Sequence, residues 1–521
     1  MTALAHRSEL PGRRTQAEAL STLDALSLVL LCGLAVVARR PGYLFSHSLW
    51  LDEGWVADSV RAPLRQLRLM TSSTPIGWTL LLRLVPHIGP PERLRALPLA
   101  FGVAAVVAGW SVGRGLGRPQ ALAAGLAAAL APSALANHNL KQYSADAAVT
   151  LLLLALAAWV EAGWSPRRLA VLCLVCVPAL LVSHVTMFAS AAALLALAVV
   201  ALLRRDRGQL AWTLALGAGT ALVEGVIYLV FAAPGNNADM QRIWEPLFVP
   251  LSDGPGRAAG FVVTRLASAL DRVGFGPPLL AAAVVCAGVA VLWRARQRAA
   301  AMAVPLLTAV LVLASATRRY PLLDDRTSLF FTTVLTVVGA LAVGQTVAWA
   351  ARRRATLPVG LAAVVAAGAL LVPAARAAAA EQAPVSSMRA QVAYVLAHRQ
   401  PGDVVVVGWA ASFAFAYYWP DQPAFSPTQN GSAVLFRVGY PGRRDLVLTP
   451  QWRVQSLADH ALRAAAARSS SHRAWLVLAE AGDGGPVWNL AVAHARPGGA
   501  RVVRRELPRL VVFDAASGSP Q

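Results

Sequence analysis

Charged residues are scarce in this chain, and one kind of positive charge is almost missing. Only 14% of its 521 residues are charged, whereas soluble domains carry about 25%. Lysine occurs once, at Lys141, among 47 basic residues. Of its four cysteines, all in apolar stretches, Cys173 and Cys176 form a Cys-x-x-Cys pair, but this pair lies at membrane depth and has no partner pair, so we interpret the cysteines as packing residues. This composition excludes an ordinary soluble enzyme, a disordered chain and a disulfide-stabilised domain.

Apolar residues make up 57% of the chain, and the mean hydropathy is +0.54. A transmembrane helix needs about 17 to 25 mostly apolar residues, and several stretches satisfy this length or approach it. The sequence therefore predicts a polytopic α-helical membrane protein. The eleven expected spans are 22–38, 94–112, 120–136, 147–162, 169–183, 187–202, 210–232, 277–293, 299–316, 329–349 and 357–373.

The net charge of +21 would suggest nucleic-acid binding in a soluble protein, but here arginines cluster in alternate short loops. These loops lie on the same side of the membrane as the N-terminus. Because cytoplasmic loops carry the excess of basic residues, the N-terminus is expected to be cytoplasmic and the C-terminal tail extracytoplasmic. The protein would thus be a multi-pass protein of the cell membrane. The first outer loop, 39–93, departs from this pattern because it also carries arginines, including Arg39 and Arg40.

Two segments of the first outer loop are apolar without being long enough to span a bilayer. The stretch 75–88 is interrupted by Arg83, and we interpret it as interfacial or re-entrant. Before it, Val56, Val60, Leu64 and Leu67 share one helical face, which predicts a helix lying in the membrane interface. Pro63 predicts a break in this helix.

The tail shows a different pattern, because short strands alternate with helices. Strands are expected at 403–408, 445–448, 474–478 and 510–513, and helices at 384–398, 454–468 and 486–494. This alternation predicts a small α/β domain. The expected division is a transmembrane catalytic domain, 1–373, followed by an extracytoplasmic α/β domain, 374–521.

Three polar segments of the outer loops are candidates for chemistry. Asp52 and Glu53 follow the first span, where a carboxylate can serve as a general base or simply form a solvated turn. The segment 137–146 contains Lys141, Tyr143 and Asp146. A lysine ammonium can contact a phosphate as a point charge, but the same segment can equally be a polar cap between two helices.

The third candidate segment, 317–326, carries Arg318, Arg319 and Arg326 in a short outer loop. Because basic residues normally concentrate in cytoplasmic loops (the charge rule), three arginines in an outer loop indicate an anionic partner. This partner is either a lipid phosphate or the neighbouring Asp324 and Asp325. His184, at a turn between two spans, is either a helix-end residue or a contact to a lipid phosphate or sugar. No nucleotide-binding or hydrolase motif is present in the sequence.

In order and spacing, these segments resemble the GT-C superfamily of integral-membrane glycosyltransferases. The bacterial branch of protein O-mannosyltransferases and lipid A aminoarabinose transferases looks nearest. The similar segments are Leu51-Asp52-Glu53, Ser73-Thr74-Pro75-Ile76-Gly77-Trp78, Arg93-Leu94-Arg95-Ala96-Leu97-Pro98 and Lys141-Gln142-Tyr143-Ser144-Ala145-Asp146. One departure is the single Pro75, where the family often has two prolines.

The resemblance implies transfer of a sugar from a polyprenyl-phosphate donor, on the extracytoplasmic face and with inversion. The acceptor would be a glycan, a lipid or a protein, and nucleic acid is not an expected partner. Asp52 would be the catalytic base, with Glu53 and Asp146 as further acidic residues of the site. The expected contacts to the donor phosphate are Lys141, Tyr143, His184, Arg318, Arg319 and Arg326. No cofactor is indicated, and a requirement for a divalent metal is left open.

Other classes of protein share parts of this pattern. A multi-span transporter or flippase would place ionisable residues within its spans, and Glu224 is one such residue. A metal-free polymerase or ligase of lipid-linked glycans would share the arginine sites without needing Asp52. A receptor whose tail binds a partner would need neither.

Overall fold

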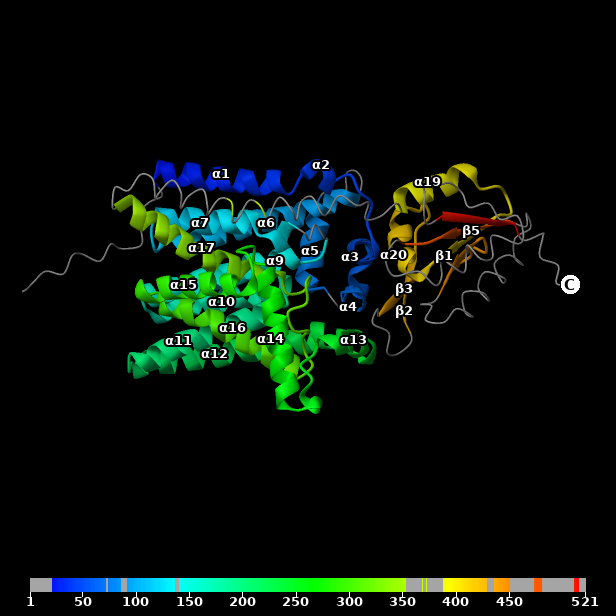
Figure 1. Ribbon diagram of the computed structural model, residues 1–521. Coiled ribbons are helices and arrows are strands. Elements are labelled where there is room, and N and C mark those ends of the chain that lie inside the picture. Colours follow the sequence, from blue (N-terminus) through cyan, green and yellow to red (C-terminus); the bar gives the residue numbers. More distant parts are fainter. Residues whose placement is uncertain are drawn as a thin grey trace, which may run out of the picture.

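A computed structural model describes residues 21–71, 74–85, 91–135, 140–352, 368, 372, 388–428, 435–449, 473–479 and 510–514. Long helices run side by side on one side of the molecule, and a small sheet with its own helices lies at the other end (Figure 1). The short helices of the first outer loop lie between these two parts (Figure 1). The expected fold class, a helical membrane protein with a small C-terminal α/β part, is confirmed.

Helices occupy ten of the eleven expected spans in the described part of the chain, and nearly all of the eleventh, 357–373, lies outside it. Among the described residues, six helical segments are long and apolar enough to cross a membrane: Pro91–Arg114, Tyr143–Ala162, Thr186–Leu203, Arg207–Gly235, Arg298–Ala316 and Leu329–Arg352. The ten helices are α1 (Thr22–Ala38), α6 (Ala96–Arg114), α7 (Arg118–Leu130), α9 (Tyr143–Ala162), α10 (Pro166–Val182), α11 (Thr186–Leu203), α12 (Arg207–Ile227), α15 (Pro278–Arg294), α16 (Arg298–Ala316) and α17 (Leu329–Arg352).

Small residues let these helices pack closely. A Cβ atom added at Gly109 of α6 would lie 3.0 Å from the Cβ atom of Ala128 on α7. At Gly77 it would lie 2.9 Å from the carbonyl carbon of Leu181 on α10. In membranes, where lipid competes for apolar surface, such close approach is a main source of helix association.

The first outer loop folds into short helices: α2 (Pro41–Leu44), α3 (Leu51–Arg61), α4 (Leu67–Met70) and α5 (Ile76–Leu84). With nine residues, α5 is about 14 Å long, too short to span a bilayer, in line with its interpretation as interfacial or re-entrant. The chain breaks after Arg61, just before Pro63, as the sequence predicts.

The apolar face of α3 is buried by protein, which corrects its interpretation as a helix lying against lipid. Val56 and Val60 belong to one apolar core with residues of the C-terminal part. Leu64, expected on the same face, is 68% exposed. The reason is the break at Pro63, which turns Leu64 outward, whereas Leu67 of α4 is buried again.

A second outer segment, expected as a loop over 233–276, also contains helices, among them α13 (Ala238–Trp244) and α14 (Pro255–Asp271). Arg265 of α14 donates hydrogen bonds to the carbonyl oxygens of Leu322 (2.8 Å) and Leu323 (2.9 Å). Arg272 donates a third, to Leu323. These bonds hold the arginine-rich segment 317–328 against α14 of the outer segment.

The C-terminal part contains a four-stranded sheet in the order β4-β1-β5-β6. β1 (Val404–Val407) is fully buried and lies parallel to β4 (Leu446–Leu448) and β5 (Arg473–Val477). β6 (Leu510–Asp514) is antiparallel to β5. Helix α19 (Met388–His398) precedes the sheet. These elements match the expected ones, while the expected helices at 454–468 and 486–494 lie outside the described residues.

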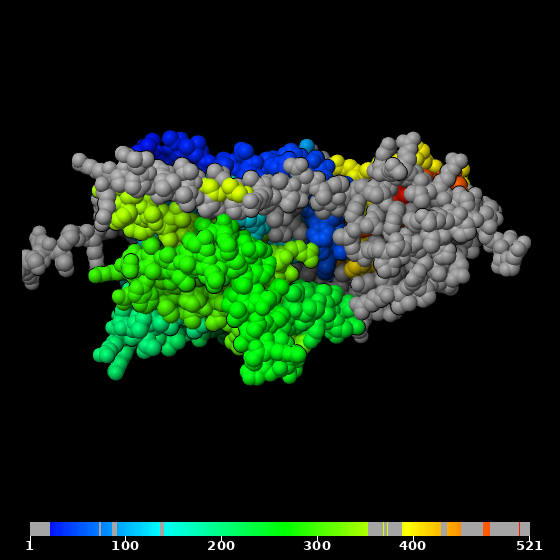
Figure 2. Space-filling model, viewed as in Figure 1, coloured from blue at the N-terminus to red at the C-terminus, as the bar shows by residue number. Residues whose placement is uncertain are grey.

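Three elements of this part are additions to the sequence prediction. Helix α20 (Trp409–Tyr418) follows β1 directly, and β2 (Ala424–Pro427) forms an antiparallel hairpin with β3 (Phe436–Gly439). Helix α20 packs against α3: a Cβ atom at Gly54 would lie 2.8 Å from Ala414 Cα. Figure 2 shows the first outer loop, in blue, at the surface between the green helices and the yellow C-terminal segments.

Gly54→Ala should loosen this helix contact, because the new methyl group meets backbone atoms of α20 that have little room to move. We expect a loss of about 1 to 3 kcal/mol in the free energy of unfolding, as for other overpacked sites. Thermal unfolding of the purified protein measures it. Gly42→Ala is the control, since nothing lies within 4 Å of a Cβ atom at Gly42. Equal melting temperatures for the two variants would contradict the packing described.

Candidate active site

Asp52 is the second residue of α3, where the helix begins at the outer side of the bundle. Its Oδ2 atom lies 3.2 Å from Lys141 Nζ and 3.1 Å from Arg326 Nη1. The carboxylate side chain is 13% exposed. Two cations predicted as phosphate ligands therefore converge on the predicted base, although Arg326 is 274 residues away in sequence.

Lys141 and Arg326 differ in how firmly they are held. Lys141 Nζ lies 5.5 Å from the ring centre of Trp55, and its side chain is 11% exposed. Burial favours the neutral amine, but Asp52 and Tyr143 more than offset this, so the pKa of Lys141 is raised and it stays charged at neutral pH. The Arg326 side chain is 50% exposed and lies over Trp50. Arg326 is thus the more exposed of the two cations.

Glu53 points the other way, into the protein, and forms a buried ion pair with Arg95. Both side chains are 0% exposed, and the two hydrogen bonds measure 2.5 Å (Nη2 to Oε2) and 2.8 Å (Nε to Oε1). The amide of Leu140 donates a further hydrogen bond to Glu53 Oε1, at 3.1 Å. With its oxygens engaged in this way, Glu53 has the surroundings of a positioning residue.

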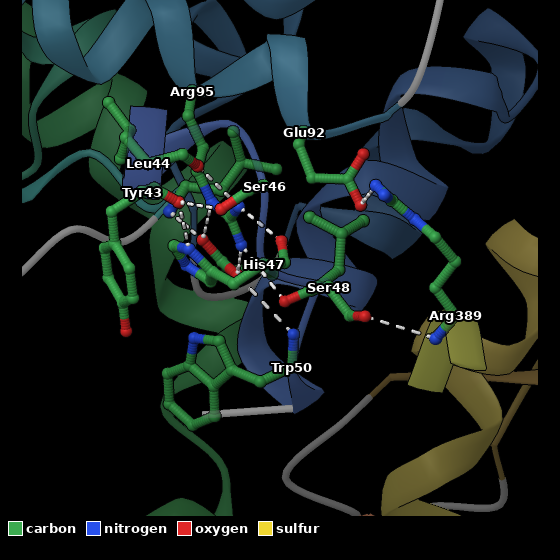
Figure 3. Close-up of polar contacts among 12 residues, drawn as sticks. Tyr43, Leu44, Ser46, His47, Ser48, Trp50, Glu92, Arg95 and Arg389 are labelled. Atoms are coloured by element: carbon green, nitrogen blue, oxygen red, sulfur yellow. Dashed lines mark hydrogen bonds and ion pairs between the residues drawn. The ribbon is translucent and has the colours of Figure 1, made fainter. Parts of the chain in front are cut away.

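The remaining hydrogen-bond donors of Arg95 bind backbone carbonyl oxygens. Its Nη1 atom donates to the carbonyl oxygens of Leu44 and His47, both at 2.8 Å, and Nη2 donates to Ser48 at 3.2 Å (Figure 3). This one guanidinium therefore fixes the chain between α2 and α3 and so the start of the helix that carries Asp52. Arg95 is a functional residue that the sequence prediction misses, although an arginine that opens an apolar span on the outer side is a signal for it.

Glu92 links the same region to the C-terminal part. Its buried carboxylate pairs with Arg389 of α19 (Figure 3) and accepts a 2.6 Å hydrogen bond from the Tyr418 hydroxyl of α20. The Tyr418 oxygen also accepts from the amide of Leu49, at 2.8 Å. Two helices of the C-terminal part thus hold the segment that leads into Asp52.

The segments that carry the family resemblance meet at Leu140. Trp78 donates a 2.9 Å hydrogen bond from Nε1 to the Leu140 carbonyl, while the Leu140 amide binds Glu53. Glu53 in turn holds Arg95. Four stretches far apart in sequence therefore close around one point, and Lys141 is the next residue along the chain.

Tyr143 and Asp146 lie three residues apart on α9 and so share a face of the helix. Both are buried. Asp52 and Asp146 both act electrostatically on the Tyr143 phenol. The Asp146 Oδ1 atom and the Ser183 hydroxyl are buried without a hydrogen-bond partner among the described residues. Asp52, Tyr143 and Asp146 thus form one polar region of the site.

The other predicted residues lie apart from Asp52. Arg318 pairs with Glu245, and Arg319 is exposed. Neither forms an ion pair with Asp52 within the described residues. His184 lies at the turn between α10 and α11, where burial lowers its pKa to about 4. At neutral pH it would offer a hydrogen bond rather than a charge.

The two aspartates expected to neutralise the loop 317–326 have separate partners. Asp325 pairs with Arg272 of α14. Asp324 accepts hydrogen bonds from the backbone amides of Arg326 (3.3 Å) and Thr327 (3.1 Å) and so stabilises the turn. This leaves the side chain of Arg326 directed to Asp52.

Asp58 is a buried acidic residue that the sequence did not single out. It is 0% exposed, and both carboxylate oxygens lack a hydrogen-bond partner among the described residues. Burial raises its pKa well above the usual value, against the opposing effect of Arg61. It therefore keeps its proton to a higher pH than an exposed aspartate does.

No group of three His, Cys, Asp or Glu side chains suited to a metal ion is found within the described ranges. His138 of the polar segment 137–146 lies outside them. The site described is thus one of carboxylates, cations and phenols.

Glu53→Gln should strongly destabilise the protein, because it leaves the Arg95 guanidinium buried without a counter-charge. Removing one partner of a buried pair typically costs about 3 to 5 kcal/mol. Thermal unfolding in detergent provides the measurement. Glu245→Gln, which breaks an exposed pair with Arg318, is the matched control and should change little. Equal, small effects of both changes would show that the buried pair does not organise the site.

Asp58→Asn should stabilise the protein, and more so at pH 8 than at pH 5. In the folded protein the pKa of Asp58 lies above its unfolded value of about 3.9. The free energy of unfolding therefore falls as the pH rises from about 3.9 towards the folded pKa, because ionising the buried carboxyl group is unfavourable. Asparagine removes this dependence. Melting temperatures of both proteins across this pH range test it, and a benefit that shrinks with rising pH would contradict the assignment.

Neither a family model nor a curated protein matches the sequence. Solved structures do match. ArnT from Cupriavidus metallidurans, in the apo state, aligns over 95% of this chain and 99% of its own, with 17% identity and a TM-score of 0.54. The archaeal oligosaccharyltransferase AglB from Archaeoglobus fulgidus, in complex with an inhibitory peptide and a dolichol-phosphate, aligns over 87% of this chain with 14% identity and a TM-score of 0.53.

This chain spans 69% of the AglB chain. It spans 61% of an A. fulgidus oligosaccharyltransferase solved with zinc and sulfate, at a TM-score of 0.48. At these identities the likeness concerns the fold. The structural neighbours are GT-C membrane glycosyltransferases, so the resemblance expected from the sequence is confirmed at the level of architecture. The chain has the fold of the GT-C superfamily.

Proposed function

We propose that this protein transfers a sugar from a polyprenyl-phosphate donor to a glycan, lipid or protein acceptor, on the extracytoplasmic face and with inversion. The observation that carries the proposal is the placement of Asp52 between Lys141 and Arg326. A base and two phosphate-binding cations meet at the outer end of a bundle of apolar helices. A reaction between a membrane-bound phosphate sugar and a hydroxyl acceptor needs this combination.

In the proposed reaction, Asp52 accepts the proton of an acceptor hydroxyl as its oxygen attacks the anomeric carbon of the sugar. The bond between that carbon and the phosphate oxygen breaks, and the lipid phosphate leaves with the bonding electrons. Attack from the face opposite the leaving group inverts the anomeric centre. The proton remains on Asp52 until it is released to water.

Lys141 and Arg326 would stabilise the charge that develops on the leaving phosphate. In the structure their shared partner is Asp52, so donor binding must draw at least one of them away from the carboxylate. Arg326 is half exposed and belongs to a loop, which makes it the one to move. A carboxylate relieved of one cation attracts a proton more strongly, so donor binding would itself activate the base.

The buried acidic residues take supporting roles in this proposal. Glu53 orients the start of α3 through Arg95 and Leu140, which sets the position of Asp52. Asp146 and Tyr143 line the inner side of the same polar region. His184, neutral at pH 7, would be a hydrogen-bonding contact to the substrate rather than a phosphate counter-ion. Arg318 and Arg319, in a loop at the outer face, would meet the donor phosphate before it reaches Lys141.

A transporter is less well supported by the same contacts. Its main sequence feature, Glu224 of α12, accepts a 2.9 Å hydrogen bond from Ser190 within the helices. The other oxygen of Glu224, Oε1, is buried without a hydrogen-bond partner among the described residues, but a single carboxylate provides no relay of charges across the membrane. A polymerase or ligase of lipid-linked glycans would share Lys141 and Arg326 but would not depend on Asp52.

Asp52→Asn should abolish sugar transfer while the protein still folds, because the amide keeps the size of the side chain but accepts no proton. A loss of about 100-fold or more in turnover is expected for a general base. The measurement is transfer from a polyprenyl-phosphate sugar by purified protein, with the melting temperature as a check. Asp253→Asn, an exposed change in another outer loop, is the control. Near-normal turnover of Asp52→Asn would contradict the base assignment and favour a lipid-linked glycan ligase.

The proposed orientation places the C-terminal part outside the cell. A cysteine at the exposed Gln422 should react with a membrane-impermeant maleimide in intact cells, in a background without the natural cysteines. One at the exposed Ala295, in an arginine-rich loop, should react only after the cells are opened. Labelling of Ala295 alone in intact cells would reverse the orientation.

A further inference from the structure

Arg39 is buried at the outer end of α1, where the charge rule expects few arginines. It is only 5% exposed, whereas its neighbour Arg40 is exposed. Burial lowers the pKa of Arg39 to about 10, so the guanidinium still carries its charge at neutral pH. A buried charge needs a partner, and the proposed transfer reaction gives Arg39 none.

The visible contacts of Arg39 compensate its charge only in part. Its Nη1 atom donates to the carbonyl oxygens of Ala35 (3.0 Å) and Ala129 (3.4 Å), near the C-terminal ends of α1 and α7. Helix C-termini carry a partial negative charge of about half a unit. No carboxylate pairs with Arg39, and its Nε and Nη2 atoms donate no hydrogen bond, within the described part of the chain.

Gly102 of α6 leaves room for this guanidinium because it has no side chain. A Cβ atom at Gly102 of α6 would lie 2.7 Å from Arg39 Nε and 2.9 Å from its Cζ atom. Any larger residue would displace the guanidinium. Arg39 therefore lies in a cradle that the sequence of α6 leaves open for it.

A small, partly open cavity with a volume of about 30 Å³ adjoins the cradle. Arg39, Ser144 and Thr333 supply its polar groups, and Leu44, Pro98 and Leu329 are among its apolar walls. The Ser144 hydroxyl is buried and has no hydrogen-bond partner among the described residues. A cation and an unpaired hydroxyl thus face one space whose other walls are apolar.

We propose that this cavity binds the phosphate of a lipid, at a site separate from Asp52, Lys141 and Arg326. A phosphate offers the negative charge that Arg39 lacks and an acceptor for the Ser144 hydroxyl. The cavity has room for the phosphate oxygens alone, and the chain that carries the phosphate would leave through the open side, past the apolar walls. The phosphate belongs to either an anionic phospholipid or a polyprenyl phosphate, and the site exists whichever sugar the protein transfers.

The competing explanation makes Arg39 a cap for two helix ends and nothing more. In that case removing its charge would lower stability but leave lipid binding unchanged. The two explanations therefore differ in binding, which can be measured without any transfer reaction.

The test is native mass spectrometry of the full-length protein in a phosphate-free maltoside detergent, carrying Lys141→Ala and Arg326→Ala to remove the donor-phosphate ligands. Phosphatidylglycerol, a polyprenyl phosphate and inorganic phosphate are titrated in separate arms, with diacylglycerol as the phosphate-free control. Arg39→Gln should weaken binding about tenfold or more, the loss expected for a charge-assisted hydrogen bond. Arg40→Gln, at the exposed neighbour, should leave it unchanged.

The arm that responds to Arg39→Gln identifies the source of the phosphate. Unchanged binding of all three phosphate probes, or equal binding of diacylglycerol, would overturn the proposal. If Arg39→Gln does not fold, Ser144→Ala decides, because it keeps the helix caps and removes one donor to the ligand. Ser144→Ala should weaken binding about threefold, and binding equal to that of the parent protein would overturn the site.

Discussion

The buried ion pair between Glu53 and Arg95 is the contact on which the rest of the site depends. Taking two charges out of water costs several kcal/mol for each ion, and only good geometry with further hydrogen bonds repays it. Here the pair is bidentate, and backbone groups of Leu44, His47, Ser48 and Leu140 satisfy the remaining polar atoms. Such a pair contributes a defined geometry more than stability. It fixes the direction of α3, and Asp52 is the residue next to Glu53.

The C-terminal part supplies the second constraint on α3. Gly54 admits α20 to close contact, and Trp55 packs against Phe413 and Phe436 with ring centres 6.2 and 6.1 Å away. The other side of Trp55 lies near Lys141. A single aromatic ring thus connects the core of the C-terminal part to a cation of the site. The C-terminal part is a structural component of the site, whether or not it also recognises the acceptor.

Much of the architecture could be predicted from the sequence because apolar length and alternation are local signals. The helical spans follow from runs of apolar residues, and the run Asp403–Gly408 predicted the buried strand β1. The family resemblance depends on the order of the segments around Asp52, Trp78, Arg95 and Lys141 along the chain, and the structure brings these segments together. The features that the sequence does not predict depend on contacts between residues far apart in the chain. The pairing of Arg326 with Asp52, the covering of α3 by α20 and the burial of Arg39 leave no local pattern.

Electrostatics explains why the site would act only on its proper donor. Asp52 rests against two cations, and a phosphate can displace it from them, whereas a neutral sugar cannot. The most direct measurement of this account is the pool of polyprenyl-phosphate sugars in a strain lacking the gene, determined by mass spectrometry. The account predicts that one lipid-linked sugar accumulates and returns to its normal level with the wild-type protein but not with an inactive variant. An unchanged pool would contradict it.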